Sequence, residues 1–356
     1  MPDKREREMI GALFVLGMEG RSLQKPWAEF FVRCRVGAAV LFQRNAGDAV
    51  QVWELTRCLR RAGLVVGIDH EGGRVNRLPQ PVTPTPPFAG LGLARSPRLA
   101  ASLGELHGAE LGALGFQVNY APVLDVAADP RNRVIGDRAA SADPAVAGEL
   151  GAAYLRGLLS RGVLPCAKHF PGHGAVREDS HVSLPRSDAD AETLEALHLP
   201  PFRAAIRAGV PQVMAAHVVV PAWDPVRPAT FSRVALTDRL RGDLGFQGVV
   251  VTDDLQMAAV SRDWDIADRV LLALEAGADQ LMICHDLEVQ EAAVAAVWKA
   301  VDGRVLRRER LEASWARIGR LRKEARRAVP AKNREELLAV LGCTAHRQVA
   351  DSIPKV

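Results

Sequence analysis

The segment GVVVTDD, residues 248–254, places three consecutive valines before a threonine and two aspartates. An apolar run of β-branched residues without alternation is typical of a strand that is buried on both faces, as in a parallel sheet. Seven other short runs of this kind occur along the chain, and each is followed by a segment with helical periodicity. The eight candidate strands are residues 12–17, 38–42, 64–69, 116–126, 164–170, 212–218, 248–254 and 280–285.

The helices expected between these strands have recognisable ends. Ser96-Pro97 and Asp143-Pro144 each place a capping residue before a proline, and proline is favoured at the first helical position. Eight strand–helix units of the α/β class predict a closed (β/α)8 TIM barrel, with a doubly wound open sheet as the alternative. A dinucleotide site has little support, because no Gly-x-Gly-x-x-Gly motif follows the first strand.

The barrel pattern ends near residue 303. We therefore expect a single-domain catalytic barrel over residues 1–303 and a basic, helical and partly flexible C-terminal extension over residues 304–356. Residues 299–327 hold eleven Lys/Arg and four Asp/Glu, but Leu311, Ile318 and other apolar residues recur between the arginines at helical spacing. This pattern favours a helix that packs one face and solvates the other, with nucleic-acid binding as the alternative.

The composition is that of an ordinary globular protein, with 48% hydrophobic and 25% charged residues. No uncharged apolar stretch reaches the length of a membrane span, and the first apolar run follows acidic residues, which is a poor match to a signal peptide. The five cysteines form no C-x-x-C pair, and their odd number argues against a complete disulfide framework. We expect a cytoplasmic monomer that binds neither nucleic acid nor membrane.

Ionisable residues follow the candidate strands at the point where each strand ends. Asp69 stands at the end of the third strand, Lys168 and His169 at the end of the fifth, and Asp253 and Asp254 at the end of the seventh. The carboxyl ends of barrel strands carry the active site. An aspartate at the end of an apolar run costs free energy unless it is paired, so Asp253 is a candidate functional residue, with a helix cap as the structural alternative.

The densest segment is KHFPGHGAVREDSH, residues 168–181. Its glycines allow the backbone to approach a ligand, and Lys168 supplies three hydrogen-bond donors. Asp179 stands two positions before His181, where it can orient the imidazole and stabilise its charged form. We interpret Asp179 and His181 as an acid/base pair, whereas His173 alone favours a structural role.

Five separated motifs in the same order resemble family 3 glycoside hydrolases, specifically the single-domain bacterial β-N-acetylglucosaminidases of peptidoglycan recycling. The resemblance covers about residues 10–290. The motifs are GIDHEGGRVNR (67–77), NRVIGDRAA (132–140), KHFPGHGAVREDSH (168–181), MAAHVVVPAWD (214–224) and GFQGVVVTDDLQM (245–257).

The resemblance implies a role for each matching residue. Asp253 matches the catalytic nucleophile, His181 the general acid/base, and Asp179 its partner. It also implies a (β/α)8 barrel and no required cofactor or metal. His285 departs from many relatives, which bears on aglycone preference more than on the reaction. The substrate-binding positions that match are Asp69, Arg77, Arg138, Lys168 and His169.

Retaining glycoside hydrolysis needs a carboxylate nucleophile and a proton donor on opposite faces of the anomeric carbon, which Asp253 and His181 can supply. The expected substrate is a terminal β-linked N-acetylglucosamine on a small peptidoglycan fragment. Two alternatives share these residues: a glycoside phosphorylase with the same site, and a metal-dependent hydrolase. The latter would use Asp253 with His169, His173, His181, His217 and His285 as possible zinc ligands.

Overall fold

The structure is a computed structural model that describes residues 3–174, 176 and 184–356. It contains a sheet of eight parallel strands in the order β10-β1-β2-β3-β4-β5-β6-β9, and a bridge between Val251 and Gln280 joins the two ends of this order. The strands are β1 (Phe14–Leu16), β2 (Ala38–Leu41), β3 (Val65–Ile68), β4 (Val118–Asn119), β5 (Leu164–Phe170), β6 (Gln212–Ala215), β9 (Val249–Thr252) and β10 (Leu281–Ile283).

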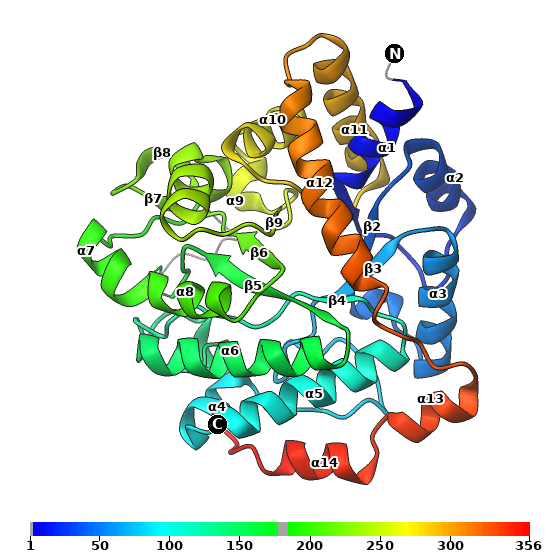
Figure 1. The fold of residues 1–356 in the computed structure, drawn as a ribbon, viewed down its shortest axis with the longest axis vertical. Coiled ribbons are helices and arrows are strands. Elements are labelled where there is room, and N and C mark those ends of the chain that lie inside the picture. Colours follow the sequence, from blue (N-terminus) through cyan, green and yellow to red (C-terminus); the bar gives the residue numbers. More distant parts are fainter. Residues whose placement is uncertain (1–2, 175, 177–183) are drawn as a thin grey trace.

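All eight predicted strands are present, so the (β/α)8 barrel is confirmed (Figure 1). The fourth strand is much shorter than the predicted range 116–126, because the regular ladder ends at Asn119. Pro122 follows, and a proline has no N–H to donate to a ladder. The barrel strands are buried along their whole length, as their uninterrupted apolar sequences predict.

The helices between the strands end where the sequence indicates. α5 (Pro97–Ala113) is capped by Ser96, whose Oγ accepts from the backbone N–H of Leu99, and Asp143 caps α6. The remaining helices around the barrel are α2 (Lys25–Cys34), α3 (Ala49–Arg61), α4 (Phe88–Ala94), α6 (Pro144–Ser160), α7 (Ala191–Thr193), α8 (Leu199–Arg207), α9 (Ala258–Ser261), α10 (Ile266–Ala276) and α11 (Leu287–Asp302).

Shorter strands and helical segments lie between the main elements of the barrel. An antiparallel hairpin, β7 (Val219–Val220) with β8 (Asp224–Pro228), follows β6. Short helical segments span Gln43–Asn45, Gly136–Arg138 and Ala229–Phe231, whereas Leu194–His198 joins α7 to α8 and Val234–Asp243 is the helix that precedes β9.

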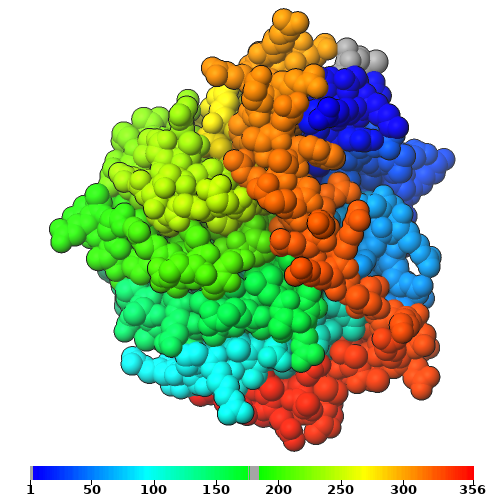
Figure 2. Space-filling model, in the orientation of Figure 1, coloured from blue at the N-terminus to red at the C-terminus, as the bar shows by residue number. Residues whose placement is uncertain are grey.

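Helices at both ends of the chain close the outside of the barrel. α1 (Lys4–Ala12) contacts α12 (Arg308–Ala325), which crosses the front of the molecule in orange (Figures 1 and 2). α12 buries Leu311, Ile318 and Leu321, so the predicted packed face is confirmed. α13 (Arg334–Val340) and α14 (Thr344–Asp351) lie along α5. None of the helices in the described ranges is both long and apolar enough to cross a membrane.

Candidate active site

A cavity of about 1040 Å³ opens at the carboxyl ends of the barrel strands. The strands run in parallel, so the residues that follow them meet at this one end of the barrel. Each predicted site residue in the described ranges lines the cavity, whereas Asp179 and His181 lie outside those ranges. The predicted residues in the lining are Asp69, Arg77, Arg138, Lys168, His169 and Asp253.

Lys168 is the centre of an ion-pair cluster at the bottom of the cavity, which we call the floor. Its Nζ contacts Asp69 Oδ1 and lies 2.6 Å from Glu71 Oε1. The lysine side chain is only 2% exposed, and a buried ammonium group is tolerated because it is paired on two sides. Burial lowers the pKa of Lys168, but the carboxylates of Asp69 and Glu71 outweigh this effect, so the pKa lies above its ordinary value.

Glu71 pairs with a second cation, Arg138. Arg138 donates from Nε and Nη2 to the two carboxylate oxygens of Glu71, each at 2.8 Å. Bidentate pairs of this kind are both strong and directional. Burial raises the pKa of Glu71, but Lys168 and Arg138 lower it more, so the pKa stays below its ordinary value. Glu71 is absent from the predicted binding residues, although it stands within the same motif as Asp69.

Arg77 completes this cluster. Its Nη2 lies 3.2 Å from Asp69 Oδ2, and its Nε donates to the Asp69 carbonyl oxygen. The floor therefore combines three cations with two carboxylates, a set rich in fixed donors and acceptors that suits the hydroxyl groups of a sugar. Asp69 is 20% exposed, so one side of the cluster faces the cavity.

Asp253 stands at the end of β9 and faces the same cavity. Within the described residues, the one hydrogen bond to its carboxylate comes from the Asp254 backbone N–H at 2.8 Å. Burial raises the pKa of Asp253, but His169, His217, the Asp254 backbone N–H and Lys168 together lower it more, so the net pKa lies below its ordinary value. Asp253 is therefore ionised at neutral pH and able to act as a nucleophile.

His169 is fixed by a carboxylate that the sequence analysis missed. Its Nδ1 lies 2.7 Å from Oδ2 of Asp125, which is fully buried and also accepts from the His173 backbone N–H. Burial raises the pKa of Asp125, but His169 and His173 together lower it more, to about 2. Asp125 interrupts the apolar run PVLDV, and an aspartate beside an apolar run also singled out Asp253, so this signal was available.

Two further histidines, His217 and His285, both contact Asp254. His217 contacts the Thr230 hydroxyl and donates to the Asp254 carbonyl oxygen, and His285 lies 3.4 Å from the Asp254 carboxylate. His173 is buried, with no hydrogen bond to its ring from the described part of the chain. Among the residues that the structure describes, no three His, Cys, Asp or Glu side chains gather at a metal-binding distance.

Comparisons with known proteins agree with this geometry. Residues 7–321 match the family model described as the glycosyl hydrolase family 3 N terminal domain. A β-hexosaminidase of Thioalkalivibrio sulfidiphilus is 41% identical over 286 residues, which are 77% of this chain and 81% of that protein.

Two solved structures share the fold. A family 3 β-N-acetylglucosaminidase from a Paenibacillus species is 36% identical with a TM-score of 0.89, and the match covers 94% of this chain and 67% of that one. NagZ of Neisseria gonorrhoeae, in complex with N-trifluoroacetyl-D-glucosamine, is 30% identical with a TM-score of 0.79 and covers 96% of both chains. This chain therefore belongs to glycoside hydrolase family 3, in the branch of the β-N-acetylhexosaminidases.

Proposed function

We propose that the protein is a retaining exo-β-N-acetylglucosaminidase that releases terminal N-acetylglucosamine from small peptidoglycan fragments. The observation that carries this proposal is the ionised carboxylate of Asp253 in one cavity with the cluster of Lys168, Asp69 and Arg138. The Neisseria relative, which covers nearly the whole chain, is itself described with an N-acylated glucosamine.

In this mechanism an oxygen of Asp253 attacks the anomeric carbon and the bond to the leaving sugar breaks. His181, oriented by Asp179, gives a proton to the departing oxygen and later removes one from the water that releases the sugar. The lowered pKa of Asp253 supports the nucleophilic role, because only the ionised carboxylate can attack. A histidine fits the second role, since its ordinary pKa lies near neutrality.

The cluster on the floor of the cavity binds the terminal sugar in this proposal. Asp69 and His169 accept from or donate to its hydroxyl groups, while Lys168 and Arg138 hold the floor in one geometry. Glu71 is 3% exposed and does not line the cavity, so it acts by positioning Lys168 and Arg138. Hydrogen bonds held in place before the substrate arrives cost little ordering entropy on binding.

Basic residues at the mouth of the cavity favour a leaving group that carries a negative charge. Arg74, Arg131 and Arg133 line the cavity. Arg74 pairs with Asp137 and Arg131 with Asp129, whereas the Arg133 side chain has no hydrogen bond or ion pair within the described residues. Peptidoglycan fragments carry carboxylates on their lactyl and peptide groups, which Arg133 can bind. We further infer a monomer acting in the cytoplasm.

The substrate test compares chromogenic β-N-acetylglucosaminide, β-glucoside and β-xyloside under identical conditions. We expect strong preference for the first, because the acetamide is required. Equal or better turnover of the β-glucoside contradicts the assignment. Repeating the assay without phosphate separates a hydrolase from a phosphorylase, and activity that survives exhaustive chelation separates it from a metal-dependent hydrolase.

The acid/base assignment has its own test. His181→Ala should lose much more rate on an unactivated glycoside than on an aryl glycoside with a good leaving group, because a good leaving group needs little protonation. Asp179→Asn should give a milder version of the same defect. Equal losses on both substrates would assign the role elsewhere, with His169 and Glu178 as the next candidates.

A further inference from the structure

One wall of the cavity mouth is aromatic. Phe42 follows β2 and His285 follows β10, and both line the cavity. Their rings stack with centroids 6.2 Å apart and an interplanar angle of 18°. The His285 side chain is 52% exposed, so this aromatic wall, His285 stacked on Phe42, presents an imidazole ring to the mouth of the cavity.

The aromatic wall is held more firmly than an exposed side chain normally is. The His285 backbone N–H donates to Gln256 Oε1 at 2.6 Å, and its imidazole Nε2 lies 3.4 Å from Asp254 Oδ2. The preceding residue is fixed as well, because the Cys284 N–H donates to Asp254 Oδ1 at 3.1 Å. A surface fixed by several contacts loses little freedom when it binds a ligand.

Arg44 connects the two sides of the aromatic wall. Its guanidinium lies 4.7 Å from the Phe42 ring centroid, and it donates to the carbonyl oxygen of Cys284. Arg44 is itself paired with Glu19 at 2.8 Å. The ends of β1, β2 and β10 are thereby tied together beside the two rings.

The depth of the cavity indicates which sugar meets this wall. Lys168, on the floor, is 2% exposed, whereas His285 at the mouth is 52% exposed. If the floor holds the terminal sugar, the sugar beyond the scissile bond lies at the mouth. In the closed ring of eight strands, β10 stands four places from β4, whose following loop carries Arg133. The aromatic wall therefore faces the basic side of the mouth.

We propose that His285 and Phe42 form the binding surface for the pyranose ring of the leaving sugar. This inference rests on the proposed function. The C–H face of the pyranose lies against the exposed imidazole of His285, which the stacked Phe42 ring supports from behind, and apolar contact with this flat aromatic surface supplies the binding energy. His285 is thus a specificity residue for the leaving sugar and takes no part in bond cleavage.

The test uses two unactivated substrates that differ in whether the leaving group contains a ring. The disaccharide of two β-1,4-linked N-acetylglucosamines has a leaving pyranose, whereas methyl β-N-acetylglucosaminide does not. His285→Ala should lower kcat/KM for the disaccharide about tenfold, mainly through KM, and change the methyl glycoside less than about twofold. His285→Phe keeps a ring and should restore most of the preference.

Two further variants act as controls. Phe42→Leu keeps apolar volume but removes the aromatic ring, so it should resemble a milder His285→Ala. Leu93→Ala changes an exposed apolar residue on α4 and should leave both substrates unaffected. Thermal unfolding of each variant shows whether the fold is intact.

The outcomes separate the two proposals. A wild-type protein that cleaves neither substrate overturns both. Wild-type turnover of both substrates, with His285→Ala reducing the two equally, overturns the inference alone, because such a loss would act through Asp254 and Asp253. Unchanged disaccharide kinetics in His285→Ala overturn it as well.

Discussion

The two ends of the barrel use similar ion pairs for different purposes. At the carboxyl ends of the strands, Lys168 and Arg138 surround Glu71, and Asp69 borders the open cavity. At the opposite end, the fully buried Asp279 meets arginines 241, 310 and 317 and accepts from the Ser314 hydroxyl. Both arrangements compensate a buried carboxylate with more than one cation.

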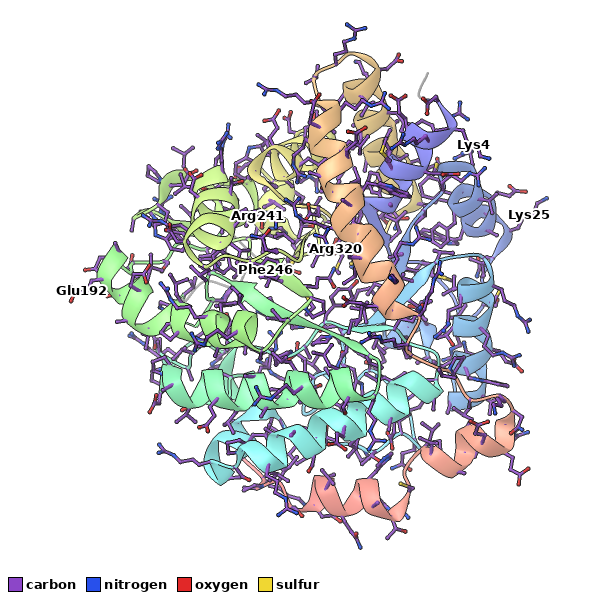
Figure 3. All side chains as sticks on the ribbon, viewed as in Figure 1. Lys4, Lys25, Glu192, Arg241, Phe246 and Arg320 are labelled. Atoms are coloured by element: carbon purple, nitrogen blue, oxygen red, sulfur yellow. The ribbon has the colours of Figure 1, made fainter. Side chains whose placement is uncertain are left out.

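The difference lies in what covers each cluster. α12 supplies three of the groups around Asp279, namely Arg310, Ser314 and Arg317, and so closes over it. Figure 3 shows this region, with Arg241, Phe246 and Arg320 labelled beside α12. No corresponding helix covers the cluster of Lys168 in the described part of the chain, where the cavity opens. A covered cluster stabilises the fold, and an open one is available to a ligand.

The largest expected effect is a loss of catalytic activity, caused by a substitution in the open cavity. Asp253→Ala should lower kcat/KM on the order of 10⁴-fold for activated and unactivated glycosides alike, because no glycosyl-enzyme can form. Its thermal stability should stay equal or fall slightly, because the lowered pKa of Asp253 means that its neighbours stabilise the charged carboxylate in the folded protein. Steady-state kinetics and thermal unfolding check both parts. An active variant would assign the nucleophile to another residue.

A substitution in the covered cluster should lower stability and leave activity unchanged. Asp279→Ala leaves three arginines facing one another without their carboxylate, and breaking a buried ion pair in this way costs about 4 kcal/mol of unfolding free energy. Urea unfolding measures the loss. Activity per folded molecule at low temperature should match the wild type, and a selective fall in kcat would instead connect Asp279 to the active site.

A pH effect should originate just behind the open cluster. His70 is buried, and burial lowers its pKa to about 4. Between pH 6.5 and pH 4 the imidazole is protonated in the unfolded chain and neutral in the folded chain. The free energy of unfolding is therefore highest above pH 6.5 and declines as the pH falls to 4. This shift corresponds to about 3 kcal/mol.

Urea unfolding between pH 7 and pH 4.5 tests this assignment. In His70→Gln the decline should become shallower, because the titrating ring is gone while an amide can still accept a hydrogen bond from the Arg77 backbone N–H, as His70 Nδ1 does. An unchanged slope in the variant would assign the pH dependence to other groups.

The smallest effect is expected at the exposed mouth. Arg133→Ala should raise KM about fivefold for a substrate whose leaving sugar carries a carboxylate, since an exposed ion pair contributes little. A neutral disaccharide should be unaffected, and stability should not change. Arg33→Ala, on α2 and away from the cavity, is the matched control. Equal effects on charged and neutral substrates would remove Arg133 from leaving-group recognition.

The sequence alone was sufficient for the barrel and for the end of it at which the ionisable residues gather. Apolar runs such as 248–252 indicate buried strands, because consecutive β-branched apolar residues favour both burial and an extended backbone. Ser96 and Asp143 mark helix starts because a cap acts within three residues. Since parallel strands gather their carboxyl ends, Asp69, Lys168 and Asp253 could be assigned to one site before their contacts were known. Asp179 and His181 stay predictions.

The tertiary structure decided which charged groups meet. Glu71 pairs with Lys168 and Arg138, and Asp125 pairs with His169, although nothing local in the chain specifies these partners. Phe42 meets His285 only because β1 places the ends of β2 and β10 near each other. Short-range patterns record local preferences, whereas the pairing, burial and pKa of these groups depend on segments that approach one another only when the barrel closes.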